Sequence, residues 1–598
     1  MTQSFPLESN MLESTTTPAN WDNADIIIAY LKILKVDYIF GVPGGAIEPL
    51  YNAIARNQSN GGPKIVVARH ESGAAFMAEG YARETGKLGV CCATTGPGST
   101  NLLTGVASAF ADNIPMLVIT AQTPLPKFGK NALQESSCTA IDTVGIFRYC
   151  CNYNTLVSHS EQINTKIVAA IMAAFRVPSG PAHLSIPSDI LREKAAKLPT
   201  LNPNNLVNEV SLVDDIAIEK LVNILSNAKR ISLFLGRDCG KAIDTIIEFA
   251  ELTNAAITTG PAAKRWVDCF HPQYHGVFGF AGHESAEKAL LDDSVDTIIA
   301  IGTQISELGT NGWNEELLSG KLVHIDENHE HFSRTSMAKH HVCGDLNGIF
   351  KQLNSNIKQG VKWGKTWGSP SAFKQHFLDQ KAISGPQVTL NMPQSCYSDA
   401  EPLKPQRVVA EFSKHIPASY RLHFDAGNVW AWFTHYHQSS NTLGHYHIAM
   451  GFGSMGWAIG AAVGSCIGSR QPSVCITGDG SYLMAGQEIT VALQHQLPVI
   501  YVIFNDSALG MVKHGQKLGG AEQVGFALPK INYAKMAESM GIEGIQVKTV
   551  DELMNINWQR LGNKQGPTMI DLHIDSTEIP PMGQRVKGLA NQSATPGG

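Results

Sequence analysis

Short apolar runs alternate with longer amphipathic stretches along most of the chain, and each apolar run ends in a turn or a polar residue. Between residues 22 and 190 the runs are a segment ending in FGVPGG, then KIVVA, GVCCATT and PMLVITA. Strands that alternate with helices in this way form parallel sheets covered by helices. The pattern therefore predicts a doubly wound α/β domain over 22–190, in which one helix begins at Glu71.

The same alternation returns twice more along the chain. The runs ISLFLG, AAITTG, DTIIAIG and KLVHID predict a central α/β domain over 206–353, and a third α/β domain is expected over 405–576. Residues 354–404 are polar and irregular, which is typical of a linker. We expect residues 1–21 to be disordered and residues 577–598 to form a tail that could fold over a site as a lid.

Composition narrows the classes of function. A chain of 598 residues with 43% apolar and 16% charged residues can bury several cores. Its formal charge is -6 and its Lys and Arg residues are scattered, so we expect no nucleic acid partner. No segment approaches the roughly 18 apolar residues of a membrane span, so we expect no membrane association. The 11 cysteines lack CxxC spacing, which predicts free thiols and a cytoplasmic protein.

The segment VCITGDGSYLMAGQEITVALQHQLPVIYVIFND carries the strongest chemical signal. It predicts a strand that ends at Gly478-Asp479-Gly480, a helix, and a second strand that ends at Asn505. A right-handed crossover makes the two strands parallel, so Asp479 and Asn505 emerge at the edge where such sheets bind ligands. Carboxylate and amide oxygens suit Mg²⁺, which usually carries substrate phosphates as well. A Gly-Asp-Gly triplet alone is as often a tight turn, but the spacing to Asn505 favours a magnesium and diphosphate site.

At this point the sequence resembles the thiamine-diphosphate enzyme family, and within it the acetolactate synthase branch. The family motif is GDG, some two dozen residues, then Asn. Further similar segments are FGVPGGAIEPLY, RHESGAAFMAEGYAR, TTGPGSTNLLTGVASAFADNIPMLVITAQTP, FDAGNVWAW and GFGSMGWAIGAAVG. The similarity covers nearly the whole chain and implies three domains, which bind the pyrimidine, form a central unit, and bind the diphosphate.

The resemblance implies a role for individual residues. Glu71 would hydrogen-bond the aminopyrimidine ring and promote loss of the thiazolium C2 proton; without the family context it would be a helix N-terminal acid that complements the helix dipole. The metal ligands would be Asp479, Asn505 and the main-chain carbonyl of Ser507. Met455 would be the apolar support that bends the cofactor, with an ordinary core methionine as the alternative.

Other residues match motifs that contact cofactor or substrate in the family. Gln134 is the candidate substrate contact near the acceptor site, with a solvated loop residue as the alternative. The remaining cofactor contacts that the resemblance implies are Pro43, Gly44, Asn101, Gly427, Asn428, Gly453, Gly478, Gly480, Ser481, Leu509, Gly510 and Met511.

Several positions depart from the acetolactate synthase pattern. Asp506 stands where a second Asn is usual, Asn428-Val429 replaces Gln-His, and Leu133 replaces a Phe. Gly515 replaces a Trp that helps to select a 2-oxo acid acceptor, and losing a buried aromatic typically frees about 150 to 250 Å². We therefore expect a different or broader acceptor. The segment 302–313 lacks the Arg residues of the family's FAD stretch, so FAD is not favoured.

The expected function is decarboxylation of a 2-oxo acid donor, with pyruvate as the first candidate, followed by carboligation to a carbonyl acceptor. One alternative is a 2-oxo acid decarboxylase without ligation, although the His-His pair usual in the first domain of such enzymes is found here only at His340-His341, in the central domain. The other is a non-catalytic regulatory homologue. Retention of Glu71, Asp479 and Asn505 argues against it. The resemblance also implies a homodimer or homotetramer with active sites between subunits.

Overall fold

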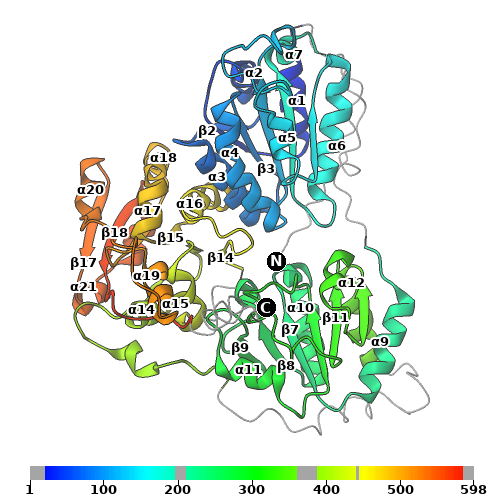
Figure 1. The fold of residues 1–598 in the computed structure, drawn as a ribbon, viewed down its shortest axis with the longest axis vertical. Coiled ribbons are helices and arrows are strands. Elements are labelled where there is room, and N and C mark those ends of the chain that lie inside the picture. The colour runs from blue at the N-terminus through cyan, green and yellow to red at the C-terminus, as the bar shows by residue number, and fades with distance from the viewer. Residues whose placement is uncertain (1–19, 196–210, 360–386, 440–443, 583–598) are drawn as a thin grey trace, which may run out of the picture.

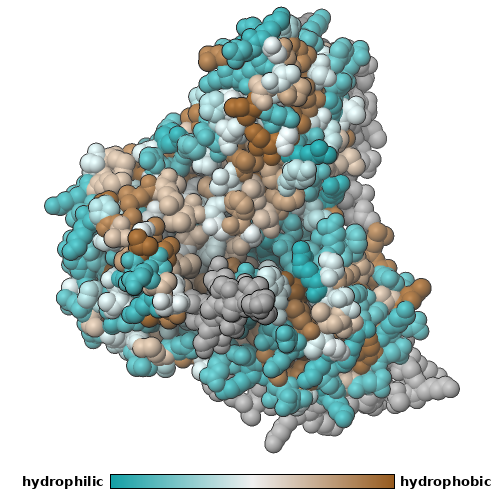
Figure 2. All heavy atoms as spheres, viewed as in Figure 1, coloured by the Kyte–Doolittle hydropathy of each residue, from teal (hydrophilic) through white to brown (hydrophobic). Residues whose placement is uncertain are grey.

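The computed structural model describes residues 20–195, 211–359, 387–439 and 444–582. They form three lobes, and each lobe is built on a six-stranded, fully parallel sheet (Figure 1). Buried apolar side chains fill both faces of the sheets, so the prediction of three doubly wound α/β domains is confirmed. Apolar side chains also gather on the part of the first lobe that faces the hollow between the three lobes (Figure 2).

The first domain has the strand order β2-β1-β3-β4-β6-β5. Its strands are β1 (Tyr38–Gly41), β2 (Lys64–Val67), β3 (Gly89–Ala93), β4 (Met116–Gln122), β5 (Tyr153–Leu156) and β6 (Pro181–Pro187), and its helices are α1 (Asn23–Ile33), α2 (Glu48–Gln58), α3 (Glu71–Thr85), α4 (Pro97–Ala111), α5 (Thr143–Phe147), α6 (Ile163–Phe175) and α7 (Ser188–Arg192). Helix α3 begins at Glu71 as predicted. The apolar runs identified in the sequence correspond to β1 through β4 and did not reveal β5 and β6.

The central domain has the strand order β12-β11-β10-β7-β8-β9. Its elements are α9 (Asp215–Asn227), β7 (Ile231–Leu235), η3 (Arg237–Ala242), α10 (Ile243–Thr253), β8 (Ala256–Thr259), η4 (Pro261–Trp266), β9 (Tyr274–Val277), α11 (Glu284–Leu291), β10 (Thr297–Ile301), β11 (Leu322–Asp326), η5 (His329–Arg334), β12 (His340–Cys343) and α12 (Leu346–Gln359). The prediction that a linker starts at Asn354 was wrong, because α12 continues to Gln359. Leu353 and Ile357 are buried on this helix and hold its last turns against the domain core.

The third domain has the strand order β14-β13-β15-β16-β18-β17. Its strands are β13 (Arg421–Phe424), β14 (Tyr446–Ile448), β15 (Ser473–Gly478), β16 (Val499–Asn505), β17 (Glu543–Val547) and β18 (Thr568–His573), and its helices include α14 (Pro405–His415), α15 (Asn428–Tyr436), α16 (Trp457–Ser469), α17 (Asp479–Ala485), α18 (Ile489–Gln494), α19 (Gly510–Leu518) and α20 (Tyr533–Ser539). Met582 is buried in this domain's core. Residues 577–582 of the predicted tail are described, whereas 583–598 of the tail and 1–19 of the predicted N-terminal extension lie outside the described residues.

Helices α3 and α16 bring the first and third domains into direct contact (Figure 1). A Cβ on Gly80 would lie 2.1 Å from the carbonyl oxygen of Ala461, and one on Gly464 would lie 1.9 Å from that of Met77. The two backbones can approach this closely only because glycine has no side chain. All eleven cysteines are free, as predicted. Among the described helices we find none with the length and apolar content of a membrane span.

Candidate active site

The two strand ends singled out in the sequence lie next to each other. Strands β15 and β16 are parallel neighbours, and Gly478 pairs with Phe504. Asp479 and Asn505 therefore follow at corresponding positions along the carboxyl edge of the sheet, and Asp479 is the first residue of α17. The geometry expected from a right-handed crossover is present.

Asp479 is a buried carboxylate with one unpartnered oxygen. The residue is 1% exposed; Oδ1 accepts a hydrogen bond of 2.9 Å from the Gly480 N–H, whereas Oδ2 has no partner. Burial, followed by the nearby charge of Asp506, raises the pKa of Asp479 to about 7, although the N–H groups of Gly480, Ser507 and Ala508 act in the opposite direction. A buried carboxyl oxygen without a partner is what a divalent cation would satisfy once the group is ionised.

The other two predicted ligands are held by the backbone around them. Asn505 donates through Nδ2 to Asp571 Oδ1 at 2.8 Å and to the carbonyl of Ile531 at 3.1 Å, which leaves its amide oxygen as the ligating end. Ser507 adopts a left-handed backbone with φ of 55°, and its carbonyl accepts a hydrogen bond of 2.9 Å from the Leu528 N–H. Since a carbonyl oxygen has two lone pairs, this contact leaves one for a metal.

No group of three or more His, Cys, Asp and Glu side chains that could hold a metal occurs in the described part of the chain. A cation at Asp479 would therefore depend on the amide and carbonyl oxygens and on oxygens of a bound ligand. That donor set is typical of Mg²⁺ with a diphosphate.

A cavity of about 640 Å³ lies beside Asp479, mainly between the central and third domains, and Asp112 of the first domain also lines it. Many of the predicted cofactor contacts line it, namely Gly427, Asn428, Gly453, Met455, Gly478, Asp479, Gly480, Ser481, Leu509, Gly510 and Met511. A Cβ on Gly427 or Gly478 would meet no atom within 4 Å, so both backbones face open space that a ligand can enter. The residues present thus fit a diphosphate held at this edge of the sheet.

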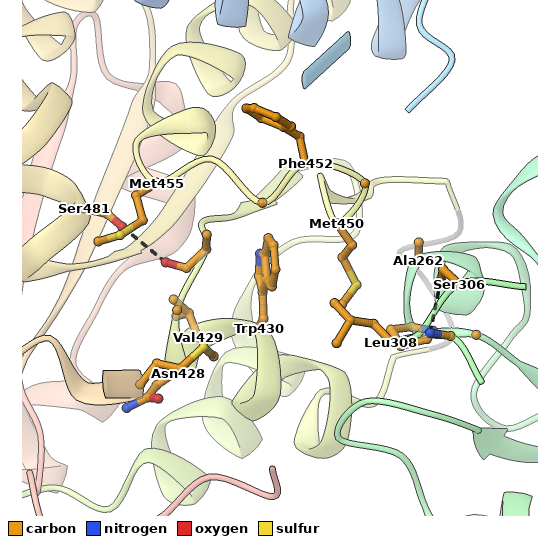
Figure 3. Close-up of a pocket in the computed structure, with 18 of the residues that line it drawn as sticks. Ala262, Ser306, Leu308, Asn428, Val429, Trp430, Met450, Phe452, Met455 and Ser481 are labelled. Carbon is orange, nitrogen blue, oxygen red and sulfur yellow. Dashed lines mark hydrogen bonds between the residues drawn. The ribbon is translucent and has the colours of Figure 1, made fainter. Parts of the chain in front are cut away.

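Figure 3 shows the cavity wall, with third-domain side chains on one side and Ser306 and Leu308 of the central domain on the other. Met455 is 37% exposed on this wall, so the core-methionine alternative does not describe it. Ser481 donates its hydroxyl to the carbonyl of Ala426 at 3.2 Å, a hydrogen bond that joins α17 to the loop after β13. The hydroxyl oxygen keeps its acceptor capacity towards a ligand.

The first-domain candidates form a separate group at the carboxyl ends of β1 to β4. Glu71 is 9% exposed, and Asn101 Nδ2 donates to its Oε2 at 3.0 Å. Gly44 packs against Thr94, where a Cβ would lie 2.6 Å from the threonine Cβ. The five candidates of this group, Pro43, Gly44, Glu71, Asn101 and Gln134, are not among the described residues that line the cavity. Within one chain, the group that includes Glu71 and the cavity that Asp479 lines are therefore at different places.

Gln134 lies on a loop that the buried side chain of Glu135 stabilises through hydrogen bonds within the loop. Glu135 accepts hydrogen bonds from the Gly129 N–H at 2.7 Å and from the Ser137 hydroxyl at 2.6 Å. The side chain of Gln134 is exposed on a backbone with φ of 58°, and the neighbouring Leu133 is 88% exposed. The loop thus holds both side chains outward from the first domain.

Sequence reasoning missed Asp425, which ties the loop after β13 to Gly456, before α16, and to the end of β15. Its carboxylate accepts hydrogen bonds from the Ala426 and Gly456 N–H groups, both at 3.0 Å, and from the Thr477 hydroxyl at 2.9 Å. Burial raises the pKa of Asp425 to about 6. An acid directly after the apolar run of β13 was the available signal, but its partners Gly456 and Thr477 are distant in the sequence.

Comparison with known proteins matches each of the three domains to one enzyme family. The N-terminal TPP binding domain of the thiamine pyrophosphate enzymes matches residues 22–142, the central domain of these enzymes matches 218–353, and their C-terminal TPP binding domain matches 425–572. A probable acetolactate synthase large subunit from Methanococcus aeolicus is 29% identical over 94% of both chains.

Two further relatives come from a bacterium and a plant. The acetolactate synthase isozyme 2 large subunit of Escherichia coli is 28% identical over 93% of this chain and 96% of its own. The chloroplastic acetolactate synthase 2 of Nicotiana tabacum is 27% identical over 93% of this chain and 82% of its own. With all three domain types in order and relatives aligned over nearly their full length, the chain belongs to the thiamine pyrophosphate enzyme family, in its acetolactate synthase-like branch.

Proposed function

We propose that the protein uses thiamine diphosphate and Mg²⁺ to decarboxylate a 2-oxo acid, with pyruvate as the first candidate, and to join the remaining acyl unit to a second carbonyl compound. The observation that carries the proposal is the buried, unpartnered oxygen of Asp479, which follows β15 next to Asn505 and lines a cavity with glycine-rich loops. Similarity to acetolactate synthases over nearly the whole chain supports the ligation step.

Each group of residues has a defined part in this chemistry. Bound thiamine diphosphate supplies the electron sink that a 2-oxo acid needs to lose CO₂. Asp479, Asn505 and the Ser507 carbonyl would hold Mg²⁺, and the loops at Gly427 and Gly478 would bind the diphosphate. Met455 would support the cofactor through its apolar side chain. Glu71 would hold and release a proton at a ring nitrogen of the aminopyrimidine.

The proposal includes an active site shared between two chains, in a dimer or in a tetramer of such dimers. Its support is the separation of Glu71 from the cavity that contains Asp479 within one chain. Large apolar side chains of the first domain are also exposed in the single chain, with Leu133 at 88%, Tyr149 at 83% and Ile141 at 56%. Exposed apolar surface of this kind is typical of an interface.

A mixture of two inactive variants tests the shared site. In a dimer of one Glu71→Gln chain and one Asp479→Asn chain, one shared site carries both changes and the other carries neither. Random assortment of equal amounts should therefore restore about a quarter of the wild-type activity. The measurement is turnover after the chains are separated and allowed to reassociate. If each site lay within one chain, the mixture would stay as inactive as its components.

The direct test of the function is to supply pyruvate, Mg²⁺ and thiamine diphosphate and to analyse the products by mass spectrometry, with a panel of aldehydes, ketones and 2-oxo acids as acceptors. CO₂ together with a carbon–carbon coupled product is the expected result. Aldehyde as the sole organic product would point to a decarboxylase without ligation. No turnover of any 2-oxo acid would point to a regulatory homologue.

The space around Gly515 predicts the acceptor preference. Gly515 lies one turn after Met511 on α19, and a Cβ there would meet only the flexible end of Met582, at 4.0 Å. Gly515→Trp should fill this space and lower kcat/KM for bulky acceptors roughly tenfold or more relative to small 2-oxo acids. The control is Gly320→Trp, because Gly320 is exposed in the central domain and has no neighbour within 4 Å of its Cβ position. An unchanged acceptor preference in Gly515→Trp would contradict the prediction.

The proposed enzyme needs no FAD and is cytoplasmic. We expect it to work without FAD, because the central segment 302–313 lacks the Arg residues of the family's FAD stretch. Stoichiometric flavin absorbance in the purified protein would overturn this expectation. The free cysteines support a reducing, cytoplasmic location.

A further inference from the structure

Asp112 is a buried acid that contacts all three domains at once. It follows α4 in the first domain and is 3% exposed. Its Oδ2 accepts from Arg83 Nη2 of the first domain at 2.5 Å. Its Oδ1 accepts from Arg237 Nη1 of the central domain at 2.5 Å and from the Gly451 N–H of the third domain at 3.1 Å. A carboxylate with this set of partners fixes the three backbones relative to one another.

Arg83 extends the same contact to a second point of the third domain. Its side chain is 4% exposed, also pairs with Glu79 at 2.6 Å, and places its guanidinium 5.2 Å from the centre of the Trp457 ring. Trp457 is the first residue of α16. Asp112 and Arg83 therefore hold the two ends of one third-domain segment, residues 451–457, which we call the bridging loop.

The bridging loop faces the cavity. Gly451, Phe452, Gly453 and Met455 all line it, and Phe452 is 53% exposed there (Figure 3). The contact with Asp112 also depends on glycine, because a Cβ on Gly451 would lie 2.4 Å from Asp112 Oδ1 and 2.7 Å from the Ala111 carbonyl oxygen. The loop is thus held at its ends and open towards the ligand in its middle.

We propose that Asp112 is a positioning residue that holds the bridging loop, and with it Met455, in the shape that receives the cofactor. The first domain of each chain then orders the cofactor cavity of its own third domain, while its Glu71 serves a different site. Asp112 also lines the cavity, but Arg83, Arg237 and the Gly451 N–H engage both of its carboxylate oxygens, so it acts through the loop and not on the reacting atoms. The part of this inference that concerns the cofactor rests on the proposed function.

The first measurement is hydrogen exchange of the full-length protein without cofactor. In Asp112→Asn, amides of residues 451–457 should exchange at least about tenfold faster, because a neutral amide holds Arg83, Arg237 and the Gly451 N–H more weakly. Gly451→Ala is the second variant, since it pushes the loop away while it keeps the acid. Glu48→Gln is the control, because it breaks an exposed ion pair with Arg192 in the same domain. Unchanged exchange of the loop in both folded variants would overturn the proposal.

The second measurement is cofactor affinity, followed by tryptophan fluorescence with thiamine diphosphate and Mg²⁺, since Trp430 lines the cavity. Both variants should bind the cofactor roughly tenfold or more weakly, while KM for pyruvate at saturating cofactor changes less than about twofold. Wild-type affinity in variants with a faster-exchanging loop would overturn the link to the cofactor. Absence of saturable cofactor binding to the wild-type protein would instead contradict the proposed function. The hydrogen-exchange data would still show whether Asp112 holds the bridging loop.

Discussion

Asp479→Asn should weaken Mg²⁺-dependent binding of thiamine diphosphate by roughly a hundredfold or more, since changes even outside the direct ligands of a metal typically cost 10- to 100-fold. The substitution keeps the shape of the side chain but removes the charge from an oxygen that has no partner within the protein. Calorimetric titration with the cofactor at saturating Mg²⁺ measures the effect. Binding of the variant at wild-type affinity would remove Asp479 from the metal site.

The pH dependence of this binding follows from the same carboxyl group. Burial and Asp506 raise the pKa of Asp479 from 3.8 to about 7, so the cofactor-free protein keeps a proton on this group up to about neutral pH. Mg²⁺ must displace that proton, because a carboxylate ligates in its ionised form. Affinity should therefore be constant above about pH 7 and fall about tenfold per pH unit below it. Asp479→Asn should show no such dependence.

Asp506→Asn is the matched control for that pH dependence. It removes the neighbouring negative charge that helps to raise the pKa of Asp479, while Asp479 itself stays in place. Binding should persist, and the pH at which affinity begins to fall should move lower. A midpoint that stays at its wild-type position would mean that burial alone sets the pKa of Asp479.

Glu71→Gln should lower turnover by roughly 10² to 10⁴ while the cofactor still binds, which is the range expected for loss of a general acid–base group. Glutamine has nearly the same volume, and its carbonyl oxygen can accept the hydrogen bond that Asn101 now donates to Glu71 at 3.0 Å. The local packing should survive, but an amide cannot take up or release a proton. The measurement is kcat with pyruvate at saturating cofactor, together with cofactor affinity.

Asn101→Ala distinguishes the contribution of the Glu71 carboxyl group from that of the hydrogen bond that Asn101 donates to it. This variant removes the hydrogen bond to Glu71 but leaves the carboxylate, so its loss of turnover should be smaller than that of Glu71→Gln. Turnover of Glu71→Gln at the wild-type rate would refute the assigned role. A larger loss in Asn101→Ala than in Glu71→Gln would mean that the cofactor contact expected of Asn101 contributes more to turnover than the proton held by Glu71.

The sequence by itself determined the structural features that are set by residues close together in the chain. The start of α3 at Glu71 and the placement of Asp479 and Asn505 at adjacent strand ends followed from apolar periodicity, glycine and the handedness of one crossover. These features are local, because hydrogen bonding and burial within one βαβ unit fix them. The three parallel sheets could be predicted for the same reason.

Other features were decided only by the tertiary structure. Strand β18 was not recognised, because the buried Asp571 in it interrupts the apolar pattern; that acid is satisfied by Asn505 and by the Tyr533 N–H. The contacts of Asp112 and Asp425 join residues far apart in the sequence, and the cavity is lined by residues of different domains. A local sequence pattern indicates which residues prefer burial or a turn. It does not indicate which distant group pairs with a buried charge, because that pairing forms only when the domains pack together.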